Sequence, residues 1–235
     1  MGAHIARTLM VKDLQALLLP GSPESTLQDY RDAIMTENIL LKPTISARKE
    51  GFTRLRQLYA LDKNIILFRS LRMLWDQDQE AQPILALLCG IARDPLLRAT
   101  VNSMISMPEE TRVDAHYFSQ IIQDNSPDQL TMVSLASVGR NIASSWSQSG
   151  HLSGRNVKVR KLINASPIVT AYALFLAYLC DIRGEALFDS PWVKILDTPR
   201  HILYQQAQQA SQFGWLEYRH SGAITDITFH YLLKD

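Results

Sequence analysis

Cysteine is scarce in this sequence, which has only two cysteines in 235 residues, Cys89 and Cys180. They lie far apart and neither belongs to a CxxC pair, so the sequence argues against a disulfide framework and against a cysteine zinc site. Both are expected to be buried thiols in a reducing, cytoplasmic environment. A signal peptide is not expected either, because Lys12 and Asp13 interrupt the first apolar run.

Recognisable catalytic patterns are also missing. None of the six histidines forms HxxxH or HExxH, or stands at metal-ligand spacing from a cysteine. A P-loop, a GxGxxG turn and a GxSxG nucleophile elbow are absent as well. Catalytic triads are assembled in space rather than in sequence, so these absences do not exclude an enzyme. They favour a binding protein that has no catalytic residues, metal or cofactor.

A long stretch without charge runs from Leu162 to Cys180, over 19 residues. This length approaches that of a transmembrane helix. However, Asn164, Ser166 and Pro167 occupy its first third, which leaves only about a dozen clearly apolar helical residues. We therefore expect a buried core helix and no membrane insertion.

Charge is distributed unevenly, although the formal net charge is only +1. Residues 1–75 contain 11 basic and 7 acidic residues, residues 76–130 contain 3 and 9, and residues 131–235 contain 10 and 7. This asymmetry predicts a basic N-terminal helical part, an acidic helical middle and a C-terminal winged-helix-like domain. In the middle part, a helix is expected to begin at Pro108, with acids in its first turn.

The first basic segment covers residues 42–56 and coincides with a predicted helix that Thr44 or Ser46 would cap. Its cations are Lys42, Arg48, Lys49, Arg54 and Arg56, against the single acid Glu50. Arg48 and Lys49 would lie in the first turn, where the helix dipole disfavours cations. An anion such as a phosphate, or a nearby acid, is therefore expected there. The alternative is a solvated basic face.

The second basic segment covers residues 155–161 and contains no acid. Its cations are Arg155, Lys158, Arg160 and Lys161. Alternation predicts a short strand with Lys158 and Arg160 on one face. Together with the helix before it, residues 130–163 form an imperfect copy of a helix followed by a basic strand. We expect these four cations to line a wing against a nucleic-acid backbone.

The C-terminal part predicts three helices followed by a hairpin. The hairpin consists of two alternating runs, Trp215–Arg219 and Ile224–Phe229, joined by a turn that contains Gly222. This order is typical of a winged helix-turn-helix, in which residues 199–213 would be the recognition helix. Its outer face offers side chains that can contact bases or phosphates, namely Arg200, Gln205, Gln208, Gln209 and Gln212. The alternative is an ordinary polar helix face.

Four segments occur in a characteristic order: ENILLKPTISARKEGFTRLRQLYAL, SVGRNIASSWSQSGHLSG, SPIVTAYALFLAYLCDIRGEALFDSPWVKIL and FGWLEYRHSGAITDITF. Together they resemble the BrxA family of bacterial BREX phage-defence systems, over nearly the whole chain, although no single motif is diagnostic. The resemblance implies an α-rich cytosolic protein with winged-helix elements and no catalytic residues. It also implies DNA binding beside the other BREX proteins, which include a methyltransferase, a phosphatase-like protein and an ATPase.

The sequence therefore predicts a mainly α protein, a helical bundle with winged helix-turn-helix elements and a C-terminal β-hairpin wing. The expected function is that of a non-enzymatic accessory protein that binds double-stranded DNA. The expected contacts are Arg48, Lys49, Arg54, Arg56, Arg155, Lys158, Arg160, Lys161, Arg200 and Gln205. A protein scaffold within the BREX complex and an RNA-binding protein are the alternatives.

Overall fold

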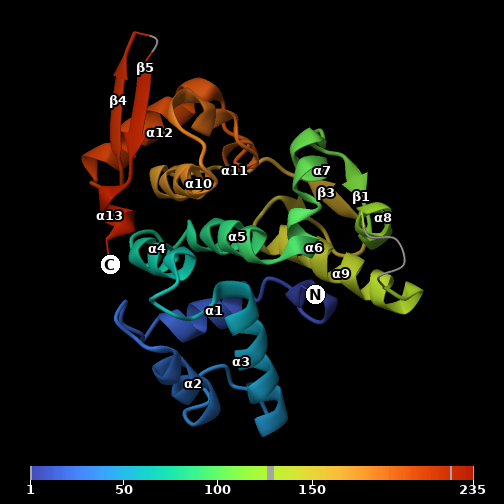
Figure 1. The fold of residues 1–235 in the computed structure, drawn as a ribbon. Helices are drawn as coiled ribbons and strands as arrows, with labels where there is room; N and C mark the ends of the chain where they lie inside the picture. Colours follow the sequence, from blue (N-terminus) through green and yellow to red (C-terminus); the bar gives the residue numbers. More distant parts are fainter. Residues whose placement is uncertain (1, 126–129, 223, 235) are drawn as a thin grey trace.

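Helices dominate the structure, a computed structural model that describes residues 2–125, 130–222 and 224–234. This part of the chain contains thirteen α-helices, two short 3-10 helices and two small antiparallel sheets. The prediction of a mainly α protein with a small sheet near the C-terminus is thus confirmed. Figure 1 shows three groups of elements: a blue N-terminal group at the bottom, a green and yellow group at the right, and an orange and red group at the upper left.

The N-terminal group supplies the first basic segment. It consists of η1 (Ala3–Ile5), α1 (Val11–Leu18), α2 (Leu27–Met35) and α3 (Ile45–Tyr59). Of the two predicted caps, Thr44 is the one that caps α3, since its side chain accepts a hydrogen bond from the backbone N–H of Ala47 at 3.1 Å. Leu55, Leu58 and Tyr59 on α3 are buried. The apolar stripe of this helix therefore faces the core, as its helical spacing predicts.

Three helices form the centre of the molecule: α4 (Ile66–Trp75), α5 (Gln82–Arg93) and α10 (Pro167–Leu179). Every residue of α10 from Ile168 to Ala177 is buried. The apolar part of the long uncharged run is thus a core helix, as predicted. The expectation that both cysteines are buried is wrong for Cys180, which follows the last residue of this helix and is exposed. Within residues 2–125, 130–222 and 224–234, no helix has the length and apolar character needed to cross a membrane.

The right-hand group contains a three-stranded sheet. Its elements are α6 (Pro95–Arg98), α7 (Val101–Ser106), β1 (Arg112–Val113), α8 (Ala115–Asn125), α9 (Met132–Gln148), β2 (Leu152–Ser153) and β3 (Lys158–Arg160). The strand order is β1-β3-β2, and both pairings are antiparallel. The predicted helix start at Pro108 is wrong, because α8 begins only at Ala115 and β1 precedes it. Pairing between β1 and the distant β3 takes the place of the expected first helical turns.

The C-terminal group consists of η2 (Gly184–Asp189), α11 (Pro191–Lys194), α12 (Arg200–Gln212), β4 (Glu217–Ser221), β5 (Ile224–Thr228) and α13 (His230–Leu233). The predicted hairpin is confirmed, with Glu217 opposite Thr228 and Ser221 opposite Ile224. Strand β4 begins and ends two residues later than the predicted run, whereas β5 begins at Ile224 as predicted. Ala223 of the turn lies outside the described residues. Figure 1 shows the hairpin projecting beyond the body of the molecule, beside α12.

One hydrophobic cluster connects all three groups. It contains buried residues from each of the predicted divisions at 1–75, 76–130 and 131–235. The boundary expected at residue 130 lies between α8 and α9, which pack closely against each other. The basic and acidic stretches of sequence therefore share one core.

At Gly139, α9 packs directly against α8. A Cβ atom at this position would lie 2.2 Å from Ser119 Oγ and 2.3 Å from the carbonyl oxygen of Ala115. No side chain fits there without moving the backbone of α8. Glycine at this position sets the distance between the two helices.

Replacing Gly139 with alanine should therefore destabilise the protein, although alanine favours helix formation. We expect a loss of about 2 kcal/mol in the free energy of unfolding, within the usual range for overpacked cores. Urea denaturation would measure it. The matched control is Gly51→Ala in α3, where the nearest atom would be Leu40 Cδ1 at 3.3 Å, on a flexible side chain. Equal losses for the two variants would contradict the role of Gly139.

Candidate nucleic-acid interface

The N-terminal part of α3 lies against the C-terminal end of α2. Arg48 Nη1 donates a hydrogen bond to the carbonyl oxygen of Met35 at 3.1 Å, and Met35 is the last residue of α2. Carbonyls at this end have no partner within their helix, and they give the helix end a partial negative charge. The negative partner that the sequence predicts for Arg48 is thus the C-terminal end of α2. No phosphate is needed to account for a cation in the first turns of α3.

Two other cations of the first basic segment also have partners. Lys42 Nζ lies 2.9 and 3.0 Å from the two carboxylate oxygens of Asp13. Arg54 Nη1 donates to Gln57 Oε1 at 3.1 Å. Lys49 and Arg56 are exposed and have no ion-pair partner among the described residues. These two remain the best placed to bind an external anion.

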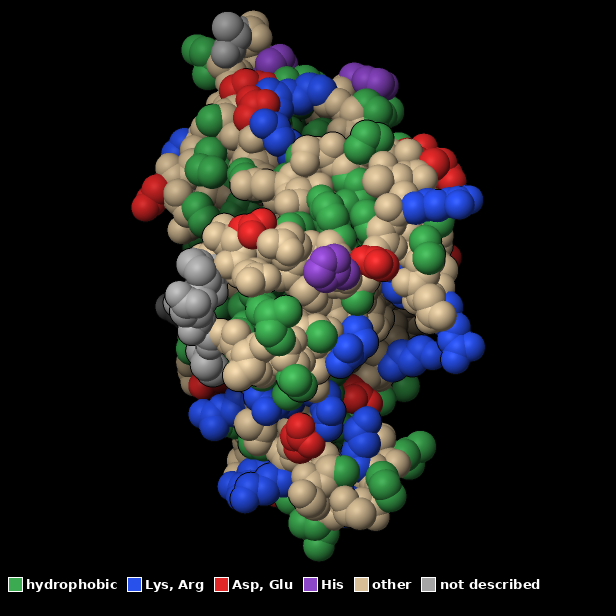
Figure 2. Space-filling view, turned by 90° about the vertical axis from the view of Figure 1, so that its right-hand side faces the viewer, with side chains coloured by type: hydrophobic (Ala, Val, Ile, Leu, Met, Phe, Trp, Pro, Cys, Tyr) green, Lys and Arg blue, Asp and Glu red, His purple; other side chains and the backbone are tan. Residues whose placement is uncertain are grey.

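A pocket of about 440 Å³ lies beside α3, and Lys42 is the cation of the first basic segment that lines it. Arg7, Lys12 and Lys42 line it together with Asp13. Gln148 at the end of α9 lines it too, so the pocket joins the N-terminal group to the right-hand group. Figure 2 shows Lys and Arg side chains gathered over the lower half of this face of the molecule, where α3 lies. Positive charge is therefore concentrated around α3.

The second basic segment contains a cation that cannot reach a nucleic acid. Arg160 lies at the end of β3, and its side chain is only 1% exposed. Its Nη2 donates to Asp197 Oδ1 at 2.5 Å, and Asp197 comes from the loop before α12. The expectation that Arg160 contacts a phosphate is therefore wrong, because this side chain is buried and paired inside the protein.

The remaining cations of this segment differ in whether another group of the protein pairs with them. Lys161 Nζ pairs with Glu110 Oε1 at 2.5 Å. Lys158 Nζ donates to the carbonyl oxygen of Gly154 at 2.9 Å. Arg155 is exposed in the loop between β2 and β3 and has no ion-pair partner among the described residues. The segment lacks acids in sequence, but Asp197 and Glu110 neutralise half of its charge in space.

On α12, Arg200 is occupied by neighbouring acids. Its Nη2 lies 2.9 Å from Glu185 Oε1 and 3.1 Å from Asp189 Oδ2. Partial burial opposes ionisation of Glu185, but hydrogen bonds from Tyr204 and Thr225 and the charge of Arg200 hold its pKa below the usual value. Arg200 thus joins α12 to η2. Gln205, in contrast, is exposed.

Two exposed arginines were missed by the sequence reasoning. Arg112 lies on β1, opposite Val159 of β3. Arg140 lies on the outer side of α9, where its Nη2 donates to Ser137 Oγ at 2.9 Å. Each is isolated in sequence, so no basic run marks it. Only the pairing of β1 with β3 and the amphipathic pattern of α9 could have indicated them.

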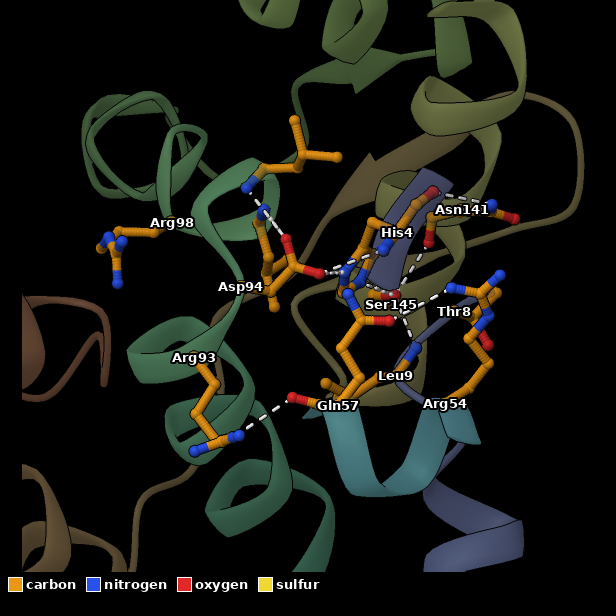
Figure 3. A network of polar contacts seen from close by, with 12 residues as sticks. His4, Thr8, Leu9, Arg54, Gln57, Arg93, Asp94, Arg98, Asn141 and Ser145 are labelled. Atoms are coloured by element: carbon orange, nitrogen blue, oxygen red, sulfur yellow. Dashed lines mark hydrogen bonds and ion pairs between the residues drawn. The ribbon is translucent and has the colours of Figure 1, made fainter. Parts of the chain in front are cut away.

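A buried polar network holds η1 in place (Figure 3). His4 Nδ1 lies 3.0 Å from Asp94 Oδ2, and His4 Nε2 lies 2.8 Å from Ser145 Oγ. This is the order of groups in a hydrolase triad. However, all three residues are buried, and Ser145 Oγ also accepts from the Leu9 N–H and donates to the carbonyl of Asn141. The arrangement fastens the N-terminal segment and leaves no space for a substrate.

Asp94 is the centre of this network. Burial opposes its ionisation, but hydrogen bonds and charge from His4, together with the Leu97 N–H, hold its pKa below the usual value. The carboxylate therefore stays charged inside the protein. In the described part of the chain, no three His, Cys, Asp or Glu side chains are grouped so that they could hold a metal ion.

Comparisons with known proteins find no matching family model, no matching curated protein and no matching solved structure.

Proposed function

We propose that this protein is a non-enzymatic accessory protein that binds double-stranded DNA in a BREX-type phage-defence system. The observation that carries the proposal is the repeated order of helices followed by a β-hairpin. In the right-hand group, α7, β1, α8 and α9 precede β2 and β3, and β1 pairs with β3. In the C-terminal group, α10, α11 and α12 precede β4 and β5. Both orders suit a winged helix-turn-helix.

In such units the last helix before the hairpin enters the major groove, and the hairpin lies along the backbone. The corresponding helices here are α9, with exposed Arg140, and α12, with exposed Gln205. Arg155 lies in the loop of the first hairpin. Exposed cations on a helix and on its wing support the proposal, because phosphate contacts come from positively charged side chains.

The BREX assignment rests on the resemblance of the four sequence segments to the BrxA family. It includes a cytoplasmic location and an association with other BREX proteins. These parts of the proposal need a test in the cell: deletion of the gene should remove phage defence, and restoring the wild-type chain should return it.

A protein scaffold is the second candidate, and an apolar pocket favours it. The pocket has a volume of about 290 Å³ and is lined by Ile91, Arg98, Val101, Asn102, Cys180, Pro191, Trp192 and Ile195. Such a pocket suits an apolar side chain of a partner protein. If partner binding and defence both survive the loss of DNA binding, the scaffold explains the protein better.

Neutralising exposed cations should weaken DNA binding without changing its sequence preference. We expect Lys49→Ala, Arg56→Ala and Arg155→Ala each to remove one phosphate contact. Each variant should therefore make the fall of log affinity with log salt less steep by about 1. Fluorescence anisotropy with a labelled duplex would measure the slope. The control is Lys63→Ala, whose ammonium pairs with Glu24 at 2.8 Å. If all three variants keep the wild-type slope, these cations do not form the interface.

A further inference from the structure

The cleft between α12 and β4 combines flat rings with exposed polar groups. It has a volume of about 560 Å³ and is lined by Tyr204, Gln205, Gln208, Tyr218, Arg219 and His220. Figure 1 shows the β4–β5 hairpin rising beside α12, and the lining residues come from β4 and α12.

Three rings in the cleft lie nearly parallel to one another. The Tyr218 and His220 planes differ by 10°, with their centroids 6.3 Å apart. The Tyr204 and His220 planes differ by 24°, with their centroids 6.0 Å apart. His220 is exposed and forms a parallel ring contact with each tyrosine. Parallel rings at the surface can take a further flat ring as a stacking partner.

Hydrogen bonds fix these rings in place. Tyr204 Oη donates to Glu185 Oε1, and Thr225 Oγ1 donates to Glu185 Oε2 at 2.7 Å. His220 Nδ1 lies 2.9 Å from the same Thr225 hydroxyl. One carboxylate thus connects the ring on α12 with the ring on β4. A ligand would meet a surface whose side chains are already ordered, which lowers the entropic cost of binding.

The polar groups of the cleft complement the rings. Gln205 and Gln208 are exposed on α12, and each amide can both donate and accept along the edge of a base. Arg219 is 79% exposed on β4 and forms an ion pair with the half-exposed Glu217 at 3.7 Å, which leaves its guanidinium open to solvent and to a phosphate. Rings for stacking, amides for a base edge and a nearby cation for a phosphate are the features that bind a nucleotide within a strand.

We propose that this cleft binds an unpaired base of a DNA strand, stacked on His220 and Tyr218 with its edge towards Gln205 and Gln208. This inference rests on the proposed DNA-binding function and names the kind of DNA preferred. A base inside a regular duplex cannot offer its face, because its neighbours are stacked on it. The protein should therefore prefer DNA that contains an unpaired base over a fully paired duplex of equal charge.

The experiment compares two labelled duplexes of the same length, one fully paired and one with a central mismatch, by fluorescence anisotropy. Wild type should bind the mismatched duplex more tightly by about fivefold to a hundredfold, the range that base–aromatic stacking provides. His220→Ala should reduce this preference while it leaves binding of the paired duplex unchanged, and Gln208→Ala should lower the ratio of the two affinities. The matched controls are His201→Ala and Gln209→Ala, which change exposed residues of α12 outside the cleft.

The outcomes separate this inference from the function on which it rests. Equal binding of both duplexes by wild type, or a preference that survives both cleft variants, overturns the inference and leaves DNA binding intact. Binding to neither duplex at low salt overturns both. Tighter binding of an RNA of the same sequence with the same mismatch overturns the assignment to DNA.

Discussion

Replacing Asp197 with alanine is expected to lower the free energy of unfolding by about 3–5 kcal/mol, the usual cost of leaving a buried charge without its partner. Asp197 is the ion-pair partner of Arg160, and the two side chains are 7% and 1% exposed. Without the carboxylate, the guanidinium keeps only its hydrogen bonds to the backbone carbonyls of His151 and Lys161. Urea denaturation of the variant would measure the loss.

Two control variants isolate the cause. Glu110→Ala removes the partner of the neighbouring Lys161, which is exposed, so its cost should stay below about 1 kcal/mol. The double variant Arg160→Leu/Asp197→Ala removes both buried charges and should be more stable than Asp197→Ala alone. If Asp197→Ala lowers the free energy of unfolding by no more than Glu110→Ala does, Arg160 is not a buried charge that depends on Asp197. It would then again be a candidate for phosphate binding.

Acid should destabilise the protein through His151, which lies close to the same ion pair. Burial lowers the pKa of His151 to about 4, helped by the charge of Arg160. The unfolded chain takes up a proton near pH 6.5, whereas the folded protein stays neutral at this site until about pH 4. Stability is therefore lost as the pH falls through this window. The expected total is about 3 kcal/mol.

Urea denaturation at a series of pH values between 7 and 4 would show this loss. His151→Gln should be less stable at neutral pH, because Gln replaces a ring that lies 3.0 Å from the Ile195 carbonyl and 2.9 Å from Ser149 Oγ. Its stability should change less with pH, since the titrating group is gone. His116→Gln, at an exposed position on α8, should keep the wild-type pH dependence. An unchanged pH dependence in His151→Gln would contradict the assignment.

Local signals made several elements predictable. Thr44 identified the start of α3 because capping depends only on adjacent backbone groups. The apolar composition of residues 168–177 identified a core helix, because burial on all sides leaves no room for charge. The hairpin of β4 and β5 followed from alternation around a glycine turn.

Distant partners explain what the sequence did not reveal. Arg160 looked like a free cation because its partner Asp197 lies 37 positions away. The two-residue strand β1 has no pattern of its own and exists through pairing with β3. Arg48 donates to a backbone carbonyl of α2, and a backbone group cannot be recognised as a partner from residue types. Charge in a sequence segment therefore overstates the charge that the folded protein presents.

The affinity of the wild-type protein for a blunt DNA duplex, measured by anisotropy from 50 to 200 mM salt, decides whether its exposed cations bind a DNA backbone. With three or more phosphate contacts, the log of the affinity should fall linearly with the log of salt concentration, with a slope of about −3 or steeper. A slope near zero, or no binding at the lowest salt concentration, would contradict the proposed function.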